Sequence, residues 1–485
     1  MVSPDIVKQK LARIRSGARP RVMDLFAGCG GMSLGFHAAG FEIRAAVEMD
    51  PLAARSHAIN FHGGDEAHAV AQDITAVEPQ QLADRLGLGD VSTAFDVVIG
   101  GPPCQAYARV GRAKLRDVAA NPRAFKEDPR GNLYLRYLHF VEHAQPVAIV
   151  VENVPDILNY GGTNVMQEIA DALKAMGYVA RYSLLNAAFY GVPQFRDRVF
   201  LIAVHRSAGV EVTFPEPSRH VELPSGYEGT RAVAYKLLRR DEGCDFVQPS
   251  EPAEGLLPAV TAAEAIGDLP VIRSHLDGTA RRGARRFDTH EPYPDDAPVS
   301  GYARSMREWK GFEADPSGLV DHVIRNLPRD TAIFREMPNG GEYPAAHATA
   351  VRLYEERKAR EEGRLGRALS GDEEAALRKA TVPPYPVATF PNRWWKLRPD
   401  MPSRTLLAHM GKDTYSHIHY DGGQGRVVSV REAARLQSFP DGFRFAGTMN
   451  PAYRQIGNAV PPVMANALAT HLAAMVLSAE ARAAA

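Results

Sequence analysis

The chain has 485 residues, of which 45% are hydrophobic and 24% are charged, the composition of a folded globular protein long enough for more than one domain. Lys and Arg together number 57, as do Asp and Glu, which excludes a uniformly basic nucleic-acid-binding protein and requires any such surface to be local. The three cysteines, Cys29, Cys104 and Cys244, are too widely spaced for a disulfide framework or a metal site. They favour free thiols in a reducing compartment.

The first 20 residues form a polar, basic leader without the apolar segment of a secretory signal. We also find no apolar run that approaches the roughly 20 residues needed to span a membrane. These features predict a cytoplasmic protein without membrane segments.

A glycine-rich turn follows the first predicted strand, residues 21–26. Gly28, Gly30 and Gly31 occupy this turn, and residues 31–39 then suit a helix that Gly40 ends. Such a turn lets the backbone approach a ligand closely and aims helix N–H groups at it. By itself the turn fits a dinucleotide site as well as any other.

Acidic residues follow the next two predicted strands. Glu48 comes directly after the strand at 42–47, where a carboxylate can bond ribose hydroxyls; a solvated surface glutamate is the alternative. Asp73 follows a weak strand at 68–71 and could accept a hydrogen bond from an adenine amino group. Together with the glycine turn, Glu48 favours a ligand that contains ribose.

Cys104 follows a buried strand at 95–99 and the stiff sequence Gly-Gly-Pro-Pro. The carboxyl end of a strand is where open α/β sheets bind ligands, and a thiolate there is a strong nucleophile. A buried structural cysteine is the plainer reading. Residues 104–130 carry seven Lys or Arg against three acids, which fits either a mobile lid over a polyanion or a solvated loop.

Glu152 ends the next apolar strand, residues 146–151, after a helix predicted at 133–142. A right-handed parallel crossover places Glu152 at the same sheet edge as Cys104. After a helix at 164–176 and a strand at 179–185, Arg196 and Arg198 alternate at period two and should share one face of a strand. Surface arginines on an edge strand are the alternative.

The pattern becomes irregular from about residue 207. Its densest basic patch is formed by Arg281, Arg282, Arg285 and Arg286, and residues 351–380 predict one or two exposed helices. Regularity returns at 396–406 and 431–440, and the chain closes with residues 455–462 and an Ala-rich helix. We find no internal repeat.

In this order, these stretches resemble the motifs of the DNA cytosine carbon-5 methyltransferases of bacterial restriction-modification type. Residues 24–35 resemble the first cofactor motif, 101–105 the nucleophile motif, 152–154 the acid motif and 194–198 the arginine motif. Residues 431–440 and 457–462 are similar to the last two motifs. One departure is Ala108 after Tyr107, where the family commonly has serine, and it puts a phosphate or loop contact in doubt.

The resemblance implies an α/β fold: a Rossmann-like, S-adenosylmethionine-dependent methyltransferase sheet with helices on both faces, plus a smaller irregular target-recognition domain. The implied organisation is a leader at 1–20, a catalytic and cofactor-binding domain at 21–207, a target-recognition domain at 208–440 and a segment at 441–485 that returns to the catalytic domain.

The resemblance also assigns residues. Cys104 is the implied nucleophile, with Glu152, Arg196 and Arg198 around the target base. The implied S-adenosylmethionine site comprises Phe26, Gly28, Gly30, Glu48, Asp73, Ile74, Gly101, Pro103, Leu133, Asn458 and Val460. The expected DNA contacts are Gln105, Arg109, Arg112, Arg281, Arg282, Arg285 and Arg286.

The implied reaction is methyl transfer to carbon 5 of a cytosine flipped out of a specific duplex sequence, through a covalent Cys104 adduct at carbon 6. The expected partners are double-stranded DNA and a cognate restriction endonuclease, with the chain a monomer associated with the nucleoid through DNA. An RNA cytosine-5 methyltransferase of the same fold is the alternative. A nicotinamide-dependent dehydrogenase would leave Cys104 and the paired arginines without a task, and an N-methyltransferase would want an aromatic residue after Pro-Pro, where this chain has Cys104.

Overall fold

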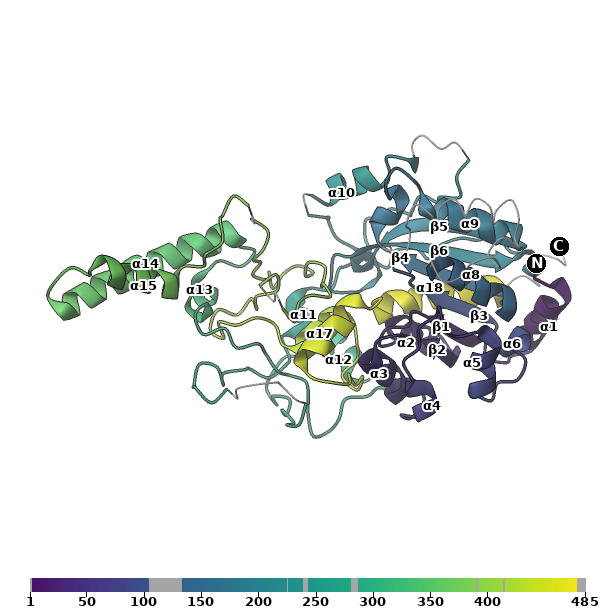
Figure 1. Cartoon of the computed structure of the whole chain (residues 1–485), viewed down its shortest axis with the longest axis horizontal. Helices are drawn as coiled ribbons and strands as arrows, with labels where there is room; N and C mark the ends of the chain where they lie inside the picture. The colour runs from purple at the N-terminus through teal and green to yellow at the C-terminus, as the bar shows by residue number, and fades with distance from the viewer. Residues whose placement is uncertain are drawn as a thin grey trace. The chain divides into compact units, whose positions relative to one another are not determined.

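The computed structural model describes residues 2–103, 133–224, 226–238, 243–280, 287–389, 391–412 and 415–477. The chain divides into two compact units (Figure 1). The first comprises Met1–Ala259, Arg444–Ala446 and Ala459–Ala485, and the second comprises Val260–Phe443 and Gly447–Asn458. The boundary between units thus falls after Ala259, whereas the sequence analysis placed a functional boundary after residue 207. Which residues recognise DNA is a separate matter and stays a prediction.

Within the described residues, the first unit contains a six-stranded sheet in the order β2-β1-β3-β4-β6-β5. The strands β1 to β4 are mutually parallel, while β6 runs antiparallel to both β4 and β5. The chain leaves β1 toward β2 on one side and β3 on the other, which makes a switch point where open α/β sheets bind ligands. The strands are β1 Arg21–Leu25, β2 Glu42–Val47, β3 Val97–Gly100, β4 Ala148–Asn153, β5 Tyr178–Asn186 and β6 Asp197–His205.

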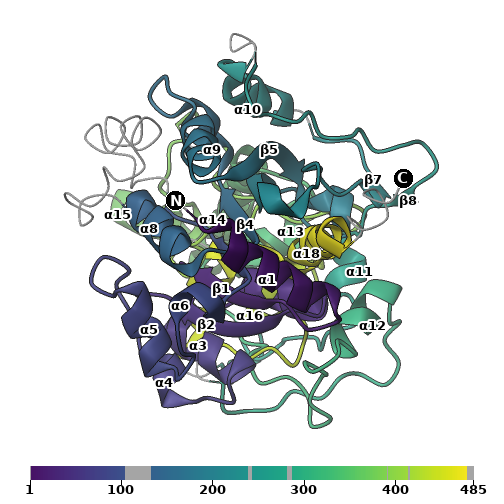
Figure 2. The ribbon, with the colours of Figure 1, turned by 90° about the vertical axis from the view of Figure 1, so that its right-hand side faces the viewer.

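Helices cover both faces of this sheet, as Figure 2 shows for α8 and α18, which lie on opposite sides of β1 and β4. The strand β3 and the residues 148–151 of β4 are continuous apolar runs because neither face meets water there. The predicted Rossmann-like α/β fold is therefore confirmed. The helices of the first unit are α1 Pro4–Arg15, α2 Gly31–Ala38, α3 Pro51–Phe61, α4 Glu66–Ala69, α5 Pro79–Arg85, α6 Val91–Ala94, α8 Leu133–Ala144, α9 Val165–Ala175, α10 Tyr227–Ala234 and α18 Pro462–Leu477.

The C-terminal helix α18 packs directly on α2. A Cβ atom on Gly35 would lie 2.4 Å from Cβ of Ala465, so only glycine permits this approach. Apolar residues along α18, including Met464, Leu468 and Leu472, are buried in the core of the sheet. The end of the chain therefore completes the helical layer beside the glycine turn.

The polar leader at 1–20 contains the helix α1, in which Val7, Leu11 and Ile14 are buried and Nζ of Lys10 donates hydrogen bonds to three backbone carbonyls. One local prediction differs from the structure. The weak strand predicted at 68–71 is wrong, because Asp65 accepts the N–H of Ala67 and starts the short helix α4 there.

The expectation that no apolar run is long enough to span a membrane is also wrong. The helical stretch Met449–Leu477 contains a window that is long and apolar enough to cross a membrane, and half of that window is buried inside the protein. Its more apolar part is α18, whose apolar residues pack in the core of the first unit. The composition of this stretch is that of a buried core helix.

The second unit is built from short helices, one helical hairpin and long irregular segments (Figure 1). Its core is aromatic: the ring of Trp394 stacks on Tyr415 at 4.5 Å between centroids and contacts Tyr343 and Phe334. The helices α14 and α15 form the hairpin and account for the exposed helices predicted at 351–380. The helices of this unit are α11 Ala262–Ile266, α12 Gly301–Arg307, α13 Thr331–Glu336, α14 Tyr343–Leu365, α15 Gly371–Thr381, α16 Val430–Leu436 and α17 Met449–Asn458.

Candidate active site

The predicted chemical residues that the structure describes gather at one edge of the sheet in the first unit. The parallel strands β1 to β4 end at this edge, and the antiparallel strand β6 begins there. Asn153 of β4 is paired with Val199 of β6, which brings the end of one strand beside the start of the other. An acid at the end of β4 and an arginine at the start of β6 can therefore meet within the sheet itself.

Glu152 and Arg198 form the ion pair at this edge. Nε of Arg198 lies 2.8 Å from Oε1 of Glu152, and the two side chains are only 12% and 14% exposed. Nη1 of Arg198 also donates to the backbone oxygen of Asp197 at 2.7 Å. The Glu152 carboxylate is thus held by one arginine while remaining partly open to solvent.

The strand that carries the acid also holds the proline loop before Cys104. Nδ2 of Asn153 donates to the backbone oxygen of Pro102 at 2.7 Å, within a buried environment. A Cβ atom on Gly101 would lie 2.9 Å from Oε2 of Glu152, so the glycine lets the carboxylate lie against the loop. The sequence predicted that the ends of β3 and β4 lie together. The contacts of Glu152 and Asn153 with the proline loop are how the two ends meet.

Cys104 itself lies outside the described residues, as does the basic segment 104–130. The same holds for every expected DNA contact: Gln105, Arg109, Arg112, Arg281, Arg282, Arg285 and Arg286. Their roles stay predictions.

Arg196 does not share a strand face with Arg198. It precedes β6, is 1% exposed, and its Nη2 donates to the backbone oxygen of Ala459 at 3.2 Å. Because β6 begins at Asp197, the period-two rule does not extend back to Arg196. Arg196 therefore fastens the segment just before Val460, while Arg198 contacts the acid.

The glycine turn is bonded to Glu48. The backbone N–H of Gly28 donates to Oε2 of Glu48 at 2.9 Å, and the N–H of Asp50 donates to Oε1 at 2.8 Å. Phe26, Gly28 and Gly30 all have positive φ angles, which turns the backbone sharply between β1 and α2. A Cβ atom on Gly28 would meet nothing within 4 Å, so open space adjoins the turn. Burial raises the pKa of Glu48, while the two N–H donors oppose that shift.

The loop that carries Asp73 lies next to β2. The N–H of Gln72 donates to the backbone oxygen of Glu48 at 2.7 Å, and Oδ1 of the exposed Asp73 accepts from the N–H and hydroxyl of Thr75. Ile74 is buried, with 3% of its surface exposed. Leu133, at the start of α8, is half-buried, Gly101 is half-buried and Pro103 is exposed.

The sequence analysis missed Arg136, which orders this loop. It is 1% exposed, and its guanidinium donates to the backbone oxygens of Ile74 at 2.9 Å and Val77 at 2.5 Å. Arg136 also pairs with Glu78 at 3.1 Å. The signal was present: Arg136 lies three residues after Leu133 and four before Phe140, on the apolar face of α8.

The last two predicted cofactor residues belong to different units. Val460 lies in the first unit with 7% of its surface exposed, beside the segment that Arg196 holds. Asn458 is the last residue of α17 in the second unit.

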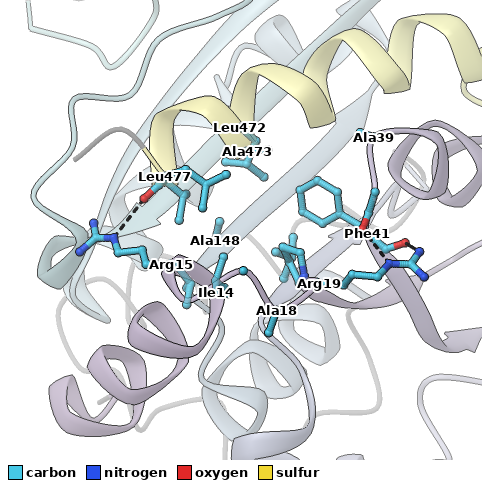
Figure 3. Close-up of a pocket in the computed structure, with 16 residues that line it drawn as sticks. Ile14, Arg15, Ala18, Arg19, Ala39, Phe41, Ala148, Leu472, Ala473 and Leu477 are labelled. Atoms are coloured by element: carbon cyan, nitrogen blue, oxygen red, sulfur yellow. Dashed lines mark hydrogen bonds between the residues drawn. The ribbon is translucent and has the colours of Figure 1, made fainter. Parts of the chain in front are cut away.

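A separate cavity of about 400 Å³ lies at the opposite edge of the sheet (Figure 3). Its lining includes Val97 and Ala148 at the amino ends of β3 and β4, together with Ile14 of α1 and Leu472 of α18. Nε of Arg15 donates to the backbone oxygen of Val476 at 3.3 Å beside it. None of the predicted site residues lines this cavity, so it is distinct from the candidate site.

Comparisons with known proteins agree with this geometry. The model of the C-5 cytosine-specific DNA methylase family matches residues 20–474. A protein named as a type II methyltransferase in Oceanobacillus iheyensis is 37% identical over 93% of this chain and 94% of its own length. The type II methyltransferase M.AgeI of Thalassovita gelatinovora is 32% identical over 93% of this chain and 98% of its own.

A crystal structure described as a DNA modification methyltransferase encoded within an E. coli prophage has the same fold. Its TM-score is 0.56 at 20% sequence identity, and the match covers 94% of this chain and 99% of that one. The match to the DNA methylase family covers nearly the whole chain. Together with the acid–arginine pair and the glycine turn at one sheet edge, it favours DNA over RNA as the substrate. The chain belongs to the C-5 cytosine-specific DNA methylase family, and it is a DNA (cytosine-5-)-methyltransferase.

Proposed function

We propose that the chain binds S-adenosylmethionine at the carboxyl edge of its sheet and methylates a flipped-out cytosine within one specific duplex sequence. The observation that carries this proposal is the Glu152–Arg198 ion pair, which lies against the proline loop that leads into Cys104. A carboxylate and a guanidinium at this position match the polar edge of a cytosine ring.

The turn in the first unit suits the methyl donor. The backbone has positive φ angles at Phe26, Gly28 and Gly30, open space adjoins the turn at Gly28, and the Glu48 carboxylate lies at its rim. Glu48 would hold the ribose and Asp73 the adenine, with Ile74, Gly101, Pro103, Leu133, Asn458 and Val460 as further contacts. When bound, S-adenosylmethionine supplies an electrophilic methyl group.

The protein's own groups make carbon 5 of cytosine reactive. The Cys104 thiolate attacks carbon 6 of the ring and forms a carbon–sulfur bond. Glu152 in its protonated form donates a hydrogen bond to N3 of the base, and Arg198 donates to its O2, which stabilises the negative charge that develops on the ring. Carbon 5 would then take the methyl group from bound S-adenosylmethionine, whose sulfur–methyl bond breaks to leave S-adenosylhomocysteine. Loss of the proton from carbon 5 and departure of the Cys104 sulfur restore the aromatic ring.

Base flipping is required because these ring atoms are out of reach of a side-chain nucleophile in stacked duplex DNA. The basic segment 104–130 and the four arginines at 281–286 would contact DNA, and residues 208–440 would recognise the target sequence. The related chains named type II methyltransferases support a cognate restriction endonuclease that acts on the same site. On this view the protein is a cytoplasmic monomer that associates with the nucleoid through DNA.

The proposal is tested by trapping. A duplex with 5-fluorocytosine at the target should give a denaturation-stable adduct with the protein and S-adenosylmethionine, because fluorine cannot leave as the proton does. The target is found first by bisulfite sequencing of DNA from cells that express the protein. An adduct that forms equally with Cys104→Ser, or no adduct with a duplex the protein methylates, would contradict the covalent mechanism.

A further inference from the structure

Three buried polar side chains lie beneath the glycine turn, and the proposed reaction gives none of them a task. The hydroxyl of Ser33 donates to Oδ2 of Asp24 at 2.6 Å and lies 3.1 Å from Nε2 of His57. All three residues are at most 1% exposed. They come from β1, α2 and α3, the three elements that surround the turn.

The direction of these hydrogen bonds follows from proton counting. Ser33 has one proton, which it gives to the Asp24 carboxylate, so its oxygen must accept a proton from His57 Nε2. Nδ1 of His57 makes no hydrogen bond within the described part of the chain, and burial lowers the pKa of His57 well below its usual value. His57 is therefore neutral and carries its proton on Nε2. A nucleophilic triad needs the opposite polarity, with histidine accepting the serine proton.

The helix α3 also touches the turn by packing. A Cβ atom on Gly30 would lie 2.4 Å from Cε2 of Phe61 and 3.0 Å from Cδ2 of His57. The start of α3 is fixed as well, because Glu48 accepts the N–H groups of both Asp50 and Gly28. Thus α3 contacts the turn at two points. Glu48 joins Asp50, at the start of α3, to Gly28, and His57 of α3 packs against Gly30.

We propose that His57 is a positioning residue for the methyl donor, which holds the glycine turn and the first turn of α2 in their binding conformation through Ser33 and Asp24. This inference rests on the proposed binding of S-adenosylmethionine at that turn. The physical reason is that backbone donors bind a ligand well only when they are already aimed at it. His57 fixes the Ser33 hydroxyl, Ser33 joins α2 to the end of β1, and the turn between them is thereby fixed at both ends.

Asp24 is the titratable member of this network, so the affinity for S-adenosylmethionine should depend on pH. Burial raises the pKa of Asp24 to about 7, the Ser33 hydrogen bond lowers it, and Glu48 raises it further. Cys29 and Tyr137 also face Asp24, and burial keeps both of them protonated at neutral pH. Ionised Asp24 accepts a stronger hydrogen bond from Ser33 than the neutral acid does. Affinity for S-adenosylmethionine should therefore increase as the pH rises through about 7.

The test compares variants of the full-length protein. His57→Leu should raise KM for S-adenosylmethionine by about 3- to 10-fold, the equivalent of one lost hydrogen bond, with kcat unchanged at saturating cofactor. His57→Gln should restore much of the affinity, because the glutamine amide can donate the same hydrogen bond. Ser33→Ala should move the pH midpoint of binding upward, because it removes the bond that lowers the pKa of Asp24. The control is His220→Leu, an exposed histidine of the first unit, which should change nothing.

An unchanged KM and pH midpoint in both His57→Leu and Ser33→Ala would overturn the inference. So would equal losses in His57→Leu and His57→Gln, since packing alone would then explain the effect. If His57→Leu fails to fold, Ser33→Ala and His57→Gln decide the matter by the same criteria. Failure of the proposed function looks different: the unaltered protein would not bind S-adenosylmethionine, or Glu48→Ala would bind it as well as the unaltered protein does.

Discussion

The two units of this protein are stabilised in different ways. The first has a continuous apolar core in which β3 and β4 are buried on both faces. The second has little regular sheet, and its α16 instead buries two arginines: Arg431 pairs with Asp321 at 2.8 Å, and Arg435 pairs with Asp441 at 2.5 Å. A third arginine, Arg426, pairs with Glu432 at 2.6 Å, and all three are at most 2% exposed on their side chains.

This difference follows from backbone geometry. A sheet satisfies its own N–H and C=O groups, so its interior can be purely apolar. Irregular segments leave backbone oxygens without partners, and an arginine with five donors can serve several at once. Arg431 bonds the backbone oxygens of Pro440 and Phe443 as well as Asp321. The reaction is proposed for the sheet of the first unit. Recognition of DNA is proposed for irregular segments, which buried ion pairs and arginine hydrogen bonds stabilise.

The largest effect expected is on the reaction alone. Cys104→Ser should abolish methyl transfer, because a hydroxyl is a far weaker nucleophile than a thiolate, while binding of DNA and S-adenosylmethionine persists. Turnover is measured with labelled S-adenosylmethionine and a target duplex. Substantial residual turnover would mean that the thiol is not the nucleophile.

The next largest effect should strike the second unit only. Arg431→Ala leaves Asp321 buried without a partner and should lower the free energy of unfolding of that unit by about 3–5 kcal/mol. All three tryptophans, Trp309, Trp394 and Trp395, belong to the second unit, so tryptophan fluorescence during urea unfolding reports on it selectively.

Two controls sharpen this experiment. Arg398→Ala breaks an exposed ion pair with Asp400 and should cost about 1 kcal/mol or less. The double variant Arg431→Met with Asp321→Leu should recover much of the lost stability, because it removes both buried charges. Equal losses in the free energy of unfolding for Arg431→Ala and Arg398→Ala would show that the buried ion pairs do not stabilise the second unit more than exposed ones do.

A smaller effect is expected at the rim of the glycine turn. Glu48→Ala should weaken S-adenosylmethionine binding by about 1.5–3 kcal/mol, the range for hydrogen bonds to a charged group, measured by calorimetry. The urea midpoint followed by tryptophan fluorescence should not move, since Glu48 is in the first unit. Unchanged affinity would mean that the ribose is held elsewhere.

DNA binding should respond to the basic patch of the second unit. Replacing Arg281, Arg282, Arg285 and Arg286 with Ala should leave cofactor affinity unchanged. If these residues contact phosphates, the salt slope of DNA binding should decrease by about 0.9 per lost contact for all sequences. If one reads a guanine, discrimination at that position should relax by roughly 1–3 kcal/mol. Lost cofactor binding with unchanged DNA binding would contradict the proposed division of labour.

Mild acid should also weaken the second unit. Arg426 and Arg435 hold the pKa values of Glu432 and Asp441 below their usual range, and burial lowers the pKa of His417 to about 4 and that of His419 to about 3. A depressed carboxylate pKa stabilises the fold above the unfolded pKa and loses that contribution only as the pH falls toward the folded value. Both carboxylates therefore keep their contribution down to about pH 4. The buried histidines act earlier, because the unfolded chain binds their protons below about pH 6.5 while the folded chain does not. The tryptophan-detected stability should be nearly constant between pH 8 and 7 and should decrease as the pH falls from about 6.5 toward 4. Constant stability between pH 6 and 5 would show that the two histidines are not neutral in the folded protein.

The sequence by itself determined the features that are local or periodic. The strand, turn and helix around Gly28 and the placement of Glu152 at the end of β4 follow from apolar runs, glycines and the parallel crossover. The same reasoning could not find the buried network of Asp24, Ser33 and His57, and it offered for Arg136 only a position on the apolar face of α8. A polar residue in a helical pattern reads as a solvated face unless its partners are known.

Only the tertiary structure decided which polar groups meet. Arg431 and Asp321 are 110 positions apart, and Arg196 and Ala459 are 263 apart, so no local pattern in the chain predicts either contact. The antiparallel direction of β6 likewise brings Arg198 to Glu152, although the sequence between them leaves that direction open. Apolar burial depends on residue type and spacing, which the sequence displays directly. A buried hydrogen bond depends on the approach of two particular atoms, which exists only once the chain has folded.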